Sequence, residues 1–187
     1  MNNTILNLVK AGALVLAGLV LGWAVRGVVG YDTTMQSVSD YQDWHTACPP
    51  ATAKDASCEM VENVVDSNTK SEVARITITK DMGKDVFGIT MPFGVALEPG
   101  IGLIFGTDPV KVYQYRTCTS VGCLAVIPLD DKLAAQLKAG KDGRVLFAGL
   151  DNKPVALPIS LKGYSEASRA FRRSEAKRSS WFWRMWS

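Results

Sequence analysis

Histidine is nearly absent from this chain of 187 residues, which has a single one, His45, and four cysteines. Zinc sites usually take Cys or His in closely spaced pairs, whereas nine residues separate Cys48 from Cys58. The sequence also lacks a C-x-x-C redox pair, a Walker loop, a G-x-S-x-G elbow and an H-E-x-x-H helix. We therefore expect no metal, no cofactor, no small-molecule substrate and no enzymatic activity.

The few remaining chemical motifs have structural explanations. His45 follows Trp44 with no nucleophile at a suggestive spacing, so we expect it to be packed or hydrogen-bonded. Asp130 and Asp131 precede a helical pattern and suit helix capping. The stretch GIGLIFG, residues 100–106, does not have the glycine spacing of a dinucleotide loop.

Long apolar runs are confined to the N-terminus. Residues 11–25 are an uninterrupted apolar or glycine run, and from Ile5 the segment reaches 21 residues with a single charge. A helix of that length, at about 1.5 Å per residue, covers the hydrocarbon layer of a membrane. We expect a single transmembrane anchor within residues 1–29, with Gly18 and Gly22 spaced for packing against another membrane helix. A cleaved signal peptide is the alternative.

All four cysteines follow this segment, as Cys48, Cys58, Cys118 and Cys123. An even number of cysteines on one side of a membrane suits an oxidising compartment, so we place the rest of the chain outside the cytoplasm. Two local disulfides, Cys48–Cys58 and Cys118–Cys123, are the simplest pairing, and the two other connectivities are left open.

The body of the chain has the pattern of an all-β domain. Short apolar or alternating runs, bounded by turn formers such as DMGKD, GTDP and DNKP, predict at least seven strands. They lie at residues 74–80, 85–91, 101–105, 110–116, 123–129, 144–150 and 155–161. We expect an antiparallel β-sandwich or barrel-like domain, preceded by the transmembrane helix.

One short helix is expected within this domain. Residues 129–140 combine a capping acid, Leu133 and Leu137 one turn apart, and a terminal glycine. A weaker helical pattern covers residues 164–178, and the expected architecture counts only the first helix.

Several blocks of the sequence resemble a known family. In chain order they are DWHTAC, CEMVENV, MPFGVALEPGIGLIFG, YRTCTSVGCLAVIPLDDKLAAQLKAGKDGRVLF and ISLKGYSEASRAF. Over about residues 41–171 the chain is similar to the invasion-associated locus B family of bacterial envelope proteins. The most specific block is C-x-x-x-G-C-x-A, from Cys118 to Ala125. The resemblance implies a β-sandwich-like domain over residues 44–171 and the same local disulfide pairing, but no general molecular activity.

The two ends of the chain depart from that family, whose members usually begin with a cleaved export signal. The head has the pattern of a retained anchor, and residues 30–43 are polar and predict a linker. The tail, residues 172–187, is basic and aromatic. The residues expected to bind lipid headgroups or a partner protein are Arg172, Arg173, Lys177, Arg178, Trp181, Phe182, Trp183 and Trp186.

Together these features predict a non-catalytic periplasmic β domain on a single-pass anchor in the bacterial inner membrane. It would bind or stabilise another envelope component through its domain and its tail. The expected partners are the lipid bilayer and an integral membrane or envelope protein complex, not nucleic acid. Two alternatives are an accessory subunit of a respiratory or photosynthetic inner-membrane complex and a secreted virulence or host-invasion factor.

Overall fold

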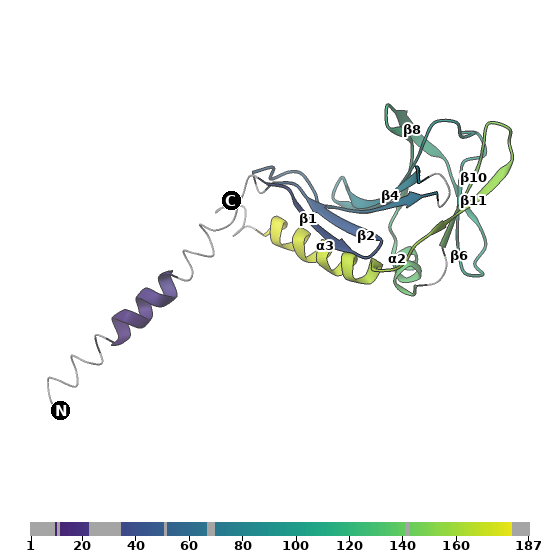
Figure 1. The fold of residues 1–187 in the computed structure, drawn as a ribbon. Helices are drawn as coiled ribbons and strands as arrows, with labels where there is room; N and C mark the ends of the chain where they lie inside the picture. Colours follow the sequence, from purple (N-terminus) through teal and green to yellow (C-terminus); the bar gives the residue numbers. More distant parts are fainter. Residues whose placement is uncertain are drawn as a thin grey trace. The chain divides into compact units, whose positions relative to one another are not determined.

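The structure is a computed structural model that describes residues 10, 12–22, 35–50, 52–66, 70–140 and 143–180. The chain divides into two compact units, residues 1–35 and 36–187 (Figure 1). Residues 12–22 are helical. Within the described ranges, no helix combines the length and the apolar character needed to cross a membrane. The remainder of the predicted anchor lies outside the described residues.

The second unit is built almost entirely of β-strands, as predicted. In chain order the elements are β1 Ser37–Tyr41, β2 Trp44–Cys48, β3 Glu59–Val65, β4 Glu72–Asp81, β5 Lys84–Met91, β6 Ile101–Phe105, β7 Lys111–Tyr113, β8 Tyr115–Thr119, β9 Gly122–Pro128, α2 Asp131–Lys138, β10 Gly143–Ala148, β11 Pro154–Ile159 and α3 Tyr164–Ser179.

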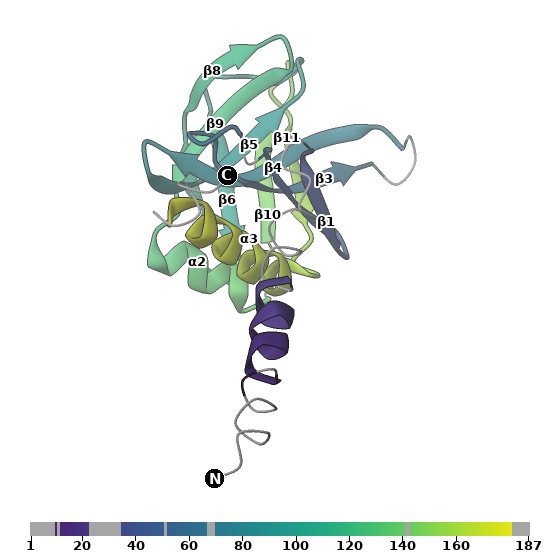
Figure 2. The same cartoon turned by 90° about the vertical axis from the view of Figure 1, so that its left-hand side faces the viewer.

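These strands form two sheets in which neighbouring strands are antiparallel (Figures 1 and 2). The seven-stranded sheet has the order β1-β2-β3-β4-β5-β9-β8, and the four-stranded sheet has the order β11-β10-β6-β7. The expected all-β antiparallel class is therefore confirmed. Helix α3 packs against β1, β2 and β3 and touches α2.

One hydrophobic core joins the two sheets and both helices. Alternate residues of β4 and β5 face it from the seven-stranded sheet, because successive side chains of a strand point to opposite faces. The fully buried large side chains are Trp44, Tyr164, Phe87, Met60, Ile76, Ile89, Met91, Ile101, Ile127, Leu137, Val61 and Val145. The predicted helix at residues 129–140 is α2, which Asp130 caps by accepting from the Leu133 backbone N–H at 2.7 Å.

The strand predicted at residues 110–116 is wrong as a single element. The chain changes sheets at Gln114, so β7 pairs with β6 whereas β8 pairs with β9. The alternation of the sequence continues through the switch because Tyr113 and Tyr115, on either side of it, are both half-buried. A period of two does not reveal which sheet a strand joins.

The linker predicted at residues 30–43 is wrong in its second half. Residues 37–41 form β1, which pairs with β2 from Ser37 opposite Cys48 to Tyr41 opposite Trp44. The strand carries no apolar stripe in its sequence, SVSDY, because it is exposed along most of its length at the edge of the sheet. An edge strand of this kind lacks the alternation by which strands are usually recognised.

The domain has a second helix, α3, which is the longer of its two. It begins after Gly163, whose φ is 81° and whose hydrogen atoms face the Tyr41 carbonyl, since an added Cβ would lie 1.8 Å from that oxygen. Its buried residues Tyr164, Ala167, Ser168 and Phe171 have the spacing of one helix face. The helix runs through the tail boundary predicted at residue 172, so the first part of that segment belongs to the domain.

Candidate functional site

Both disulfides join positions that are neighbours in the chain and in the seven-stranded sheet. Cys118 and Cys123 are directly opposite each other at the end of the β8–β9 hairpin, with Cα atoms 3.9 Å apart. Cys48 ends β2 and is bonded to Cys58, which precedes β3, with Cα atoms 4.1 Å apart. This is the simplest of the pairings considered from the sequence.

The loop between Cys48 and Cys58 receives the last turns of α3. Arg178 donates hydrogen bonds of 2.6–3.5 Å from its two terminal guanidinium nitrogens to four backbone carbonyls of this loop. One turn earlier, Glu175 Oε1 accepts from the Cys58 backbone N–H at 2.6 Å. The carbonyls belong to Pro49, Pro50, Ala53 and Ala56. The disulfide-closed loop therefore fixes the C-terminal end of the helix to the domain.

This contact changes the interpretation of the basic tail. Arg178 was expected to bind a membrane or a partner, but its guanidinium donates hydrogen bonds to backbone carbonyls of the domain itself. Arg172 and Arg173 are exposed on α3, and Lys177 lies in its last turn. The expected aromatic residues, Trp181, Phe182, Trp183 and Trp186, lie outside the described residues.

The two glycines expected to pack membrane helices lie within the helical residues 12–22. Gly18 and Gly22 are one turn apart, and an added Cβ at either position would meet nothing within 4 Å. The apolar side chains of this helix, such as Leu14 at 74% and Leu19 at 65%, are exposed. Any contact made by this helix would therefore involve something other than the described residues of its own unit.

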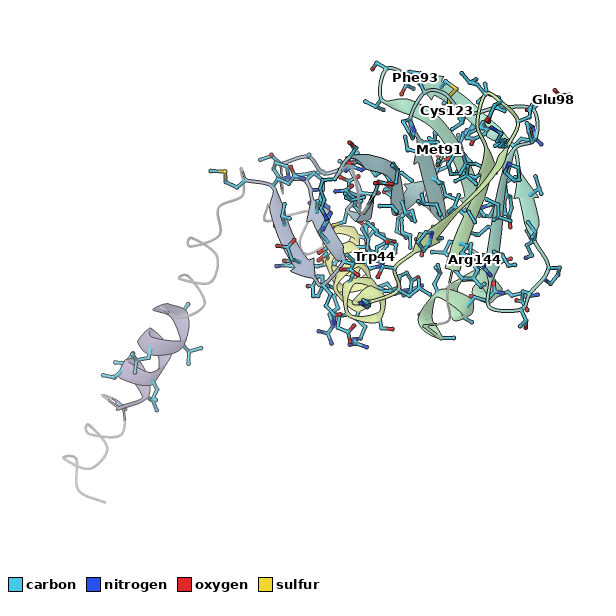
Figure 3. All side chains as sticks on the ribbon, turned by 45° about the vertical axis from the view of Figure 1, so that its right-hand side comes forward. Trp44, Met91, Phe93, Glu98, Cys123 and Arg144 are labelled. Carbon is cyan, nitrogen blue, oxygen red and sulfur yellow. A yellow bond between two sulfur atoms is a disulfide. The ribbon has the colours of Figure 1, made fainter. Side chains whose placement is uncertain are left out.

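A partly buried polar cluster surrounds Ser160, between β11 and α3. Its backbone N–H donates to Glu62 Oε1 at 2.7 Å, its carbonyl accepts from the Trp44 indole Nε1 at 2.8 Å, and its hydroxyl donates to Asp43 Oδ2 at 2.5 Å. The Trp44 ring also packs edge-on against Tyr164, with ring centroids 5.3 Å apart. The cluster thus joins β2, β3 and the start of α3 at the point where the chain leaves the four-stranded sheet (Trp44 is labelled in Figure 3).

Glu62 is the most perturbed carboxyl among the described residues. Burial raises the pKa of Glu62 to about 8, since the Ser160 N–H opposes this only in part and the negative charge of Asp43 adds to it. Its second oxygen, Oε2, is buried without a hydrogen-bond partner. A perturbed carboxyl is a common sign of an active site, but this one lies against Ser160 and lines none of the three pockets that described residues form near α2, β8 and the β4–β5 turn.

His45 does not belong to any ligand or catalytic cluster in the described part of the chain. Its Nε2 lies 3.4 Å from the Asn63 amide nitrogen and its Nδ1 lies 3.9 Å from Asp40. The described residues include no group of three or more His, Cys, Asp or Glu side chains placed to hold a metal ion.

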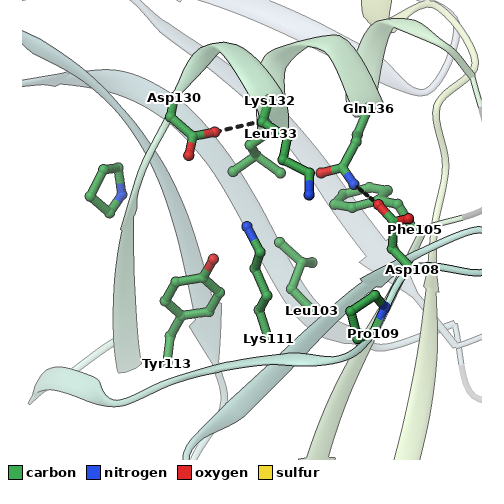
Figure 4. Close-up of a pocket in the computed structure, with 11 residues that line it drawn as sticks. Leu103, Phe105, Asp108, Pro109, Lys111, Tyr113, Asp130, Lys132, Leu133 and Gln136 are labelled. Carbon is green, nitrogen blue, oxygen red and sulfur yellow. Dashed lines mark hydrogen bonds between the residues drawn. The ribbon is translucent and has the colours of Figure 1, made fainter.

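A pocket lies between the β6–β7 edge of the four-stranded sheet and α2 (Figure 4). Lys111 and Lys132 extend their ammonium groups into it, beside the Tyr113 hydroxyl. The two acids at its rim are engaged with neutral donors, since Asp108 accepts from the Gln136 amide and Asp130 caps α2. Burial, with the nearby charge of Asp130, raises the pKa of Tyr113. The charges of Asp108 and Asp130 offset those of the two lysines in this pocket.

The sequence patterns did not point to the Ser160 cluster or to this pocket. Ser160 is 98 residues from Glu62 and 116 from Trp44 in the chain, so no local pattern links them. The strongest available signal was Glu62 itself, a charged residue within the apolar run of β3, EMVENVV. An acid at such a position indicates a partner in the fold.

The fold and its two local disulfides define a class of β domain in which two antiparallel sheets share one core with a C-terminal helix. A family model described as invasion associated locus B (IalB) protein matches residues 44–172. The chain belongs to this family.

Known relatives agree with that assignment. Invasion protein B homologues from two strains of Brucella abortus are 33% identical over 141 residues, which is 74% of this chain and 79% of each relative. The crystal structure of invasion associated protein b from Bartonella henselae has the same fold, with a TM-score of 0.65 at 22% identity. That match covers 75% of this chain and 99% of the Bartonella chain.

Proposed function

We propose that this chain is a non-catalytic, membrane-tethered β domain of the bacterial periplasm that binds another envelope component. Its domain would hold the C-terminal segment in a fixed position and present it to that component. Two disulfides support a location outside the cytoplasm, since such bonds persist in oxidising compartments. The polar cluster at Glu62 supports a structural role because Glu62 Oε1, Asp43 and Trp44 each bond to Ser160.

The observation that carries this proposal is the attachment of α3 to the Cys48–Cys58 loop. Arg178 and Glu175 fix the last turn of the helix, and the sequence WFWRMWS begins three residues after Arg178. Tryptophan and arginine are the residue types most enriched where one surface binds another, and both suit a membrane interface. A fixed starting point reduces the entropy that such a segment loses on binding.

The proposed tether is the apolar N-terminal segment. Its described helix, residues 12–22, has exposed apolar side chains, and an apolar helix of this kind favours a lipid or protein environment over water. Residues on both sides extend the apolar run in the sequence to 21 residues. This length supports a membrane span.

Removal of residues 181–187 from the tagged full-length protein tests the role of the tail. This truncation leaves Arg178 and its four carbonyl contacts intact, so the unfolding midpoint should not change. We expect the partner recovered in mild detergent to fall about tenfold or more, while the protein stays in the membrane fraction. Replacing Trp181, Trp183 and Trp186 with Ala should reproduce the loss.

A matched comparison is the pair Arg172→Ala and Arg173→Ala, which removes two exposed charges from α3 and leaves the aromatic segment, so it separates the contribution of these arginines from that of residues 181–187. If the truncated protein recovers the same partner at the same yield, the segment has no part in binding. If the protein leaves the membrane only when residues 1–29 are removed, the tether and the binding segment are separate, as proposed.

Two further functions have a specific observation in their favour. Gly18 and Gly22 lie one turn apart on a helix with open space above both, which suits an accessory subunit packed against a helix of an inner-membrane complex. Replacing both with Leu should detach such a subunit. The names of the Brucella and Bartonella relatives refer to invasion, and a released invasion factor would have a mature mass lower by about 30 residues.

A further inference from the structure

The outward face of the four-stranded sheet is almost entirely apolar. Inward-pointing residues of its strands, such as Ile101, Leu103 and Val145, belong to the core, so the alternate residues point away from it. One row across the sheet is Val112, Gly102, Leu146 and Ala156, and the next is Ile104, Arg144 and Pro158. We call these seven residues, with Val110, the apolar face.

The side chains of the apolar face form a continuous surface. An added Cβ at Gly102 would lie 3.0 Å from Val110 Cγ1 and 3.1 Å from Leu146 Cβ, so those two side chains close over the glycine. Val110 is 45% exposed and Val112 is 58% exposed. A sheet with one solvated face normally places polar residues on it, and contiguous apolar surface on a domain usually marks a contact site.

Arg144 is the single charged residue of the apolar face. It lies on β10, a central strand of the sheet, and is exposed (Figure 3). It makes no hydrogen bond or ion pair with any residue in the described ranges of the chain. An arginine among apolar side chains calls for a carboxylate when the surface around it is covered, because an unpaired buried charge is strongly unfavourable.

We propose that the apolar face docks an apolar surface of another protein that brings a carboxylate to Arg144. The proposal rests on the proposed binding role of the domain and names a second surface for it, separate from the C-terminal segment. The partner would bury the valines, Leu146 and Pro158 away from water, and its carboxylate would pair with the Arg144 guanidinium. Charge complementarity at one central position would fix the orientation of the complex.

Other occupants fit this face less well. In a symmetric dimer formed through the face, a residue near its centre meets its own copy, so two Arg144 guanidinium groups would be brought together. A bilayer covering the face would place Arg144 among acyl chains at the same depth as its apolar neighbours. An added strand at the β11 edge is hindered by Pro154 and Pro158, which have no N–H to donate.

Site-specific photo-crosslinking in the full-length protein tests the proposal. The photoreactive residue benzoylphenylalanine replaces Val112 in one variant and Val38, an equally exposed valine on β1, in the control. After irradiation of intact cells, we expect a protein adduct from position 112 that position 38 does not give. In the position-112 background, Arg144→Glu should reduce the adduct about tenfold or more, and Arg144→Lys should reduce it less.

Each other outcome overturns the proposal. These are no adduct, an adduct of twice the chain mass, a lipid adduct, or a protein adduct whose yield is the same with Arg144→Glu as with Arg144. Because Arg144 is exposed, an unchanged unfolding midpoint for Arg144→Glu shows that the variant is folded. The dependence of partner recovery on residues 181–187 is measured in the same cells and separates the two proposals. If removal of these residues still reduces recovery but position 112 gives no adduct, only the docking face is wrong.

Discussion

The outward faces of the two sheets differ in how polar and apolar side chains are mixed. The seven-stranded sheet turns Arg75, Thr77, Thr90 and Asn63 away from the core beside apolar residues of the same rows, such as Val61, Leu124 and Val126. The four-stranded sheet presents the apolar face, with Arg144 as its one charge. The first face mixes polar and apolar residues, whereas the second is apolar apart from one arginine and has no explanation in the described part of the domain itself.

The two sheets also differ in how they are held. Both disulfides, the Ser160 cluster and the contacts of α3 with strands involve the seven-stranded sheet. The four-stranded sheet has none of the disulfides. The comparison suggests that one sheet provides most of the stability and that the other is available for binding. Substitutions in the two should therefore have different consequences.

The largest effect is expected at Trp44, in the seven-stranded sheet. Trp44→Ala removes a fully buried ring that contacts Tyr164 and donates to the Ser160 carbonyl, so the free energy of unfolding should fall by about 3–5 kcal/mol. Trp44→Phe keeps an aromatic ring but leaves that carbonyl without its donor, at a cost of about 1–3 kcal/mol. Urea unfolding measures both, and equal losses would mean that the hydrogen bond, and not the packing, is dominant.

The next effect is a dependence of stability on pH that comes from Glu62. Its pKa is 4.5 when exposed and about 8 in the fold, so the folded protein retains a proton that the unfolded chain has released. This contribution is complete below pH 4.5 and is lost as the pH rises through about 8, by on the order of 4–5 kcal/mol. Glu62→Gln, which keeps an oxygen for the Ser160 N–H, should not show this loss.

Unfolding free energies at pH 4.5, 6 and 8 for both proteins provide the measurement. Subtracting one profile from the other isolates Glu62 from His45 and the remaining titratable groups. Parallel profiles would mean that the carboxyl is hydrated in the fold and ionises normally.

Local patterns in the sequence predicted the elements that their own residues mark, even where the paired strand is distant in the chain, as for β5 with β9 and β6 with β10. The strands β4, β5, β6, β9, β10 and β11 and the helix α2 follow from apolar runs between turn formers. β1 was missed because it is exposed. Arg178 was assigned to a membrane or partner because nothing in its surroundings shows that carbonyls 122–129 residues away in the chain would surround it.

The apolar face was also beyond prediction, for a different reason. RVLFAGL and VALPISL were recognised as strands because they are apolar on both faces, a pattern typical of strands that are covered on both sides. The sequence thus indicated two buried faces, and the structure covers only one of them with described residues. Which of the two faces is covered depends on where the core lies, and the local sequence does not show this.

The disulfides should have a smaller effect than Trp44, and the two should differ. Replacing Cys48 and Cys58 with Ala opens a loop with a sequence separation of 10, and replacing Cys118 and Cys123 opens one of 5. Loop entropy alone predicts losses of about 2.7 and about 2 kcal/mol. The first pair should lose more than this because its loop also holds Arg178. Urea unfolding and limited proteolysis near residue 180 distinguish them, and equal losses would show that α3 does not depend on the loop.

The smallest effect on stability is expected on the apolar face. Val110→Thr and Val112→Thr together should change the free energy of unfolding by no more than about 0.5 kcal/mol each, because both side chains are largely exposed and Thr suits a strand. Val61→Thr, a change of the same chemistry at a buried position of the seven-stranded sheet, is the matched comparison and should cost at least about 1 kcal/mol. If the exposed valines prove as costly as Val61, the apolar face is part of what holds the domain together. Its composition would then be explained by folding, and the contrast between a stabilising sheet and a binding sheet would no longer hold.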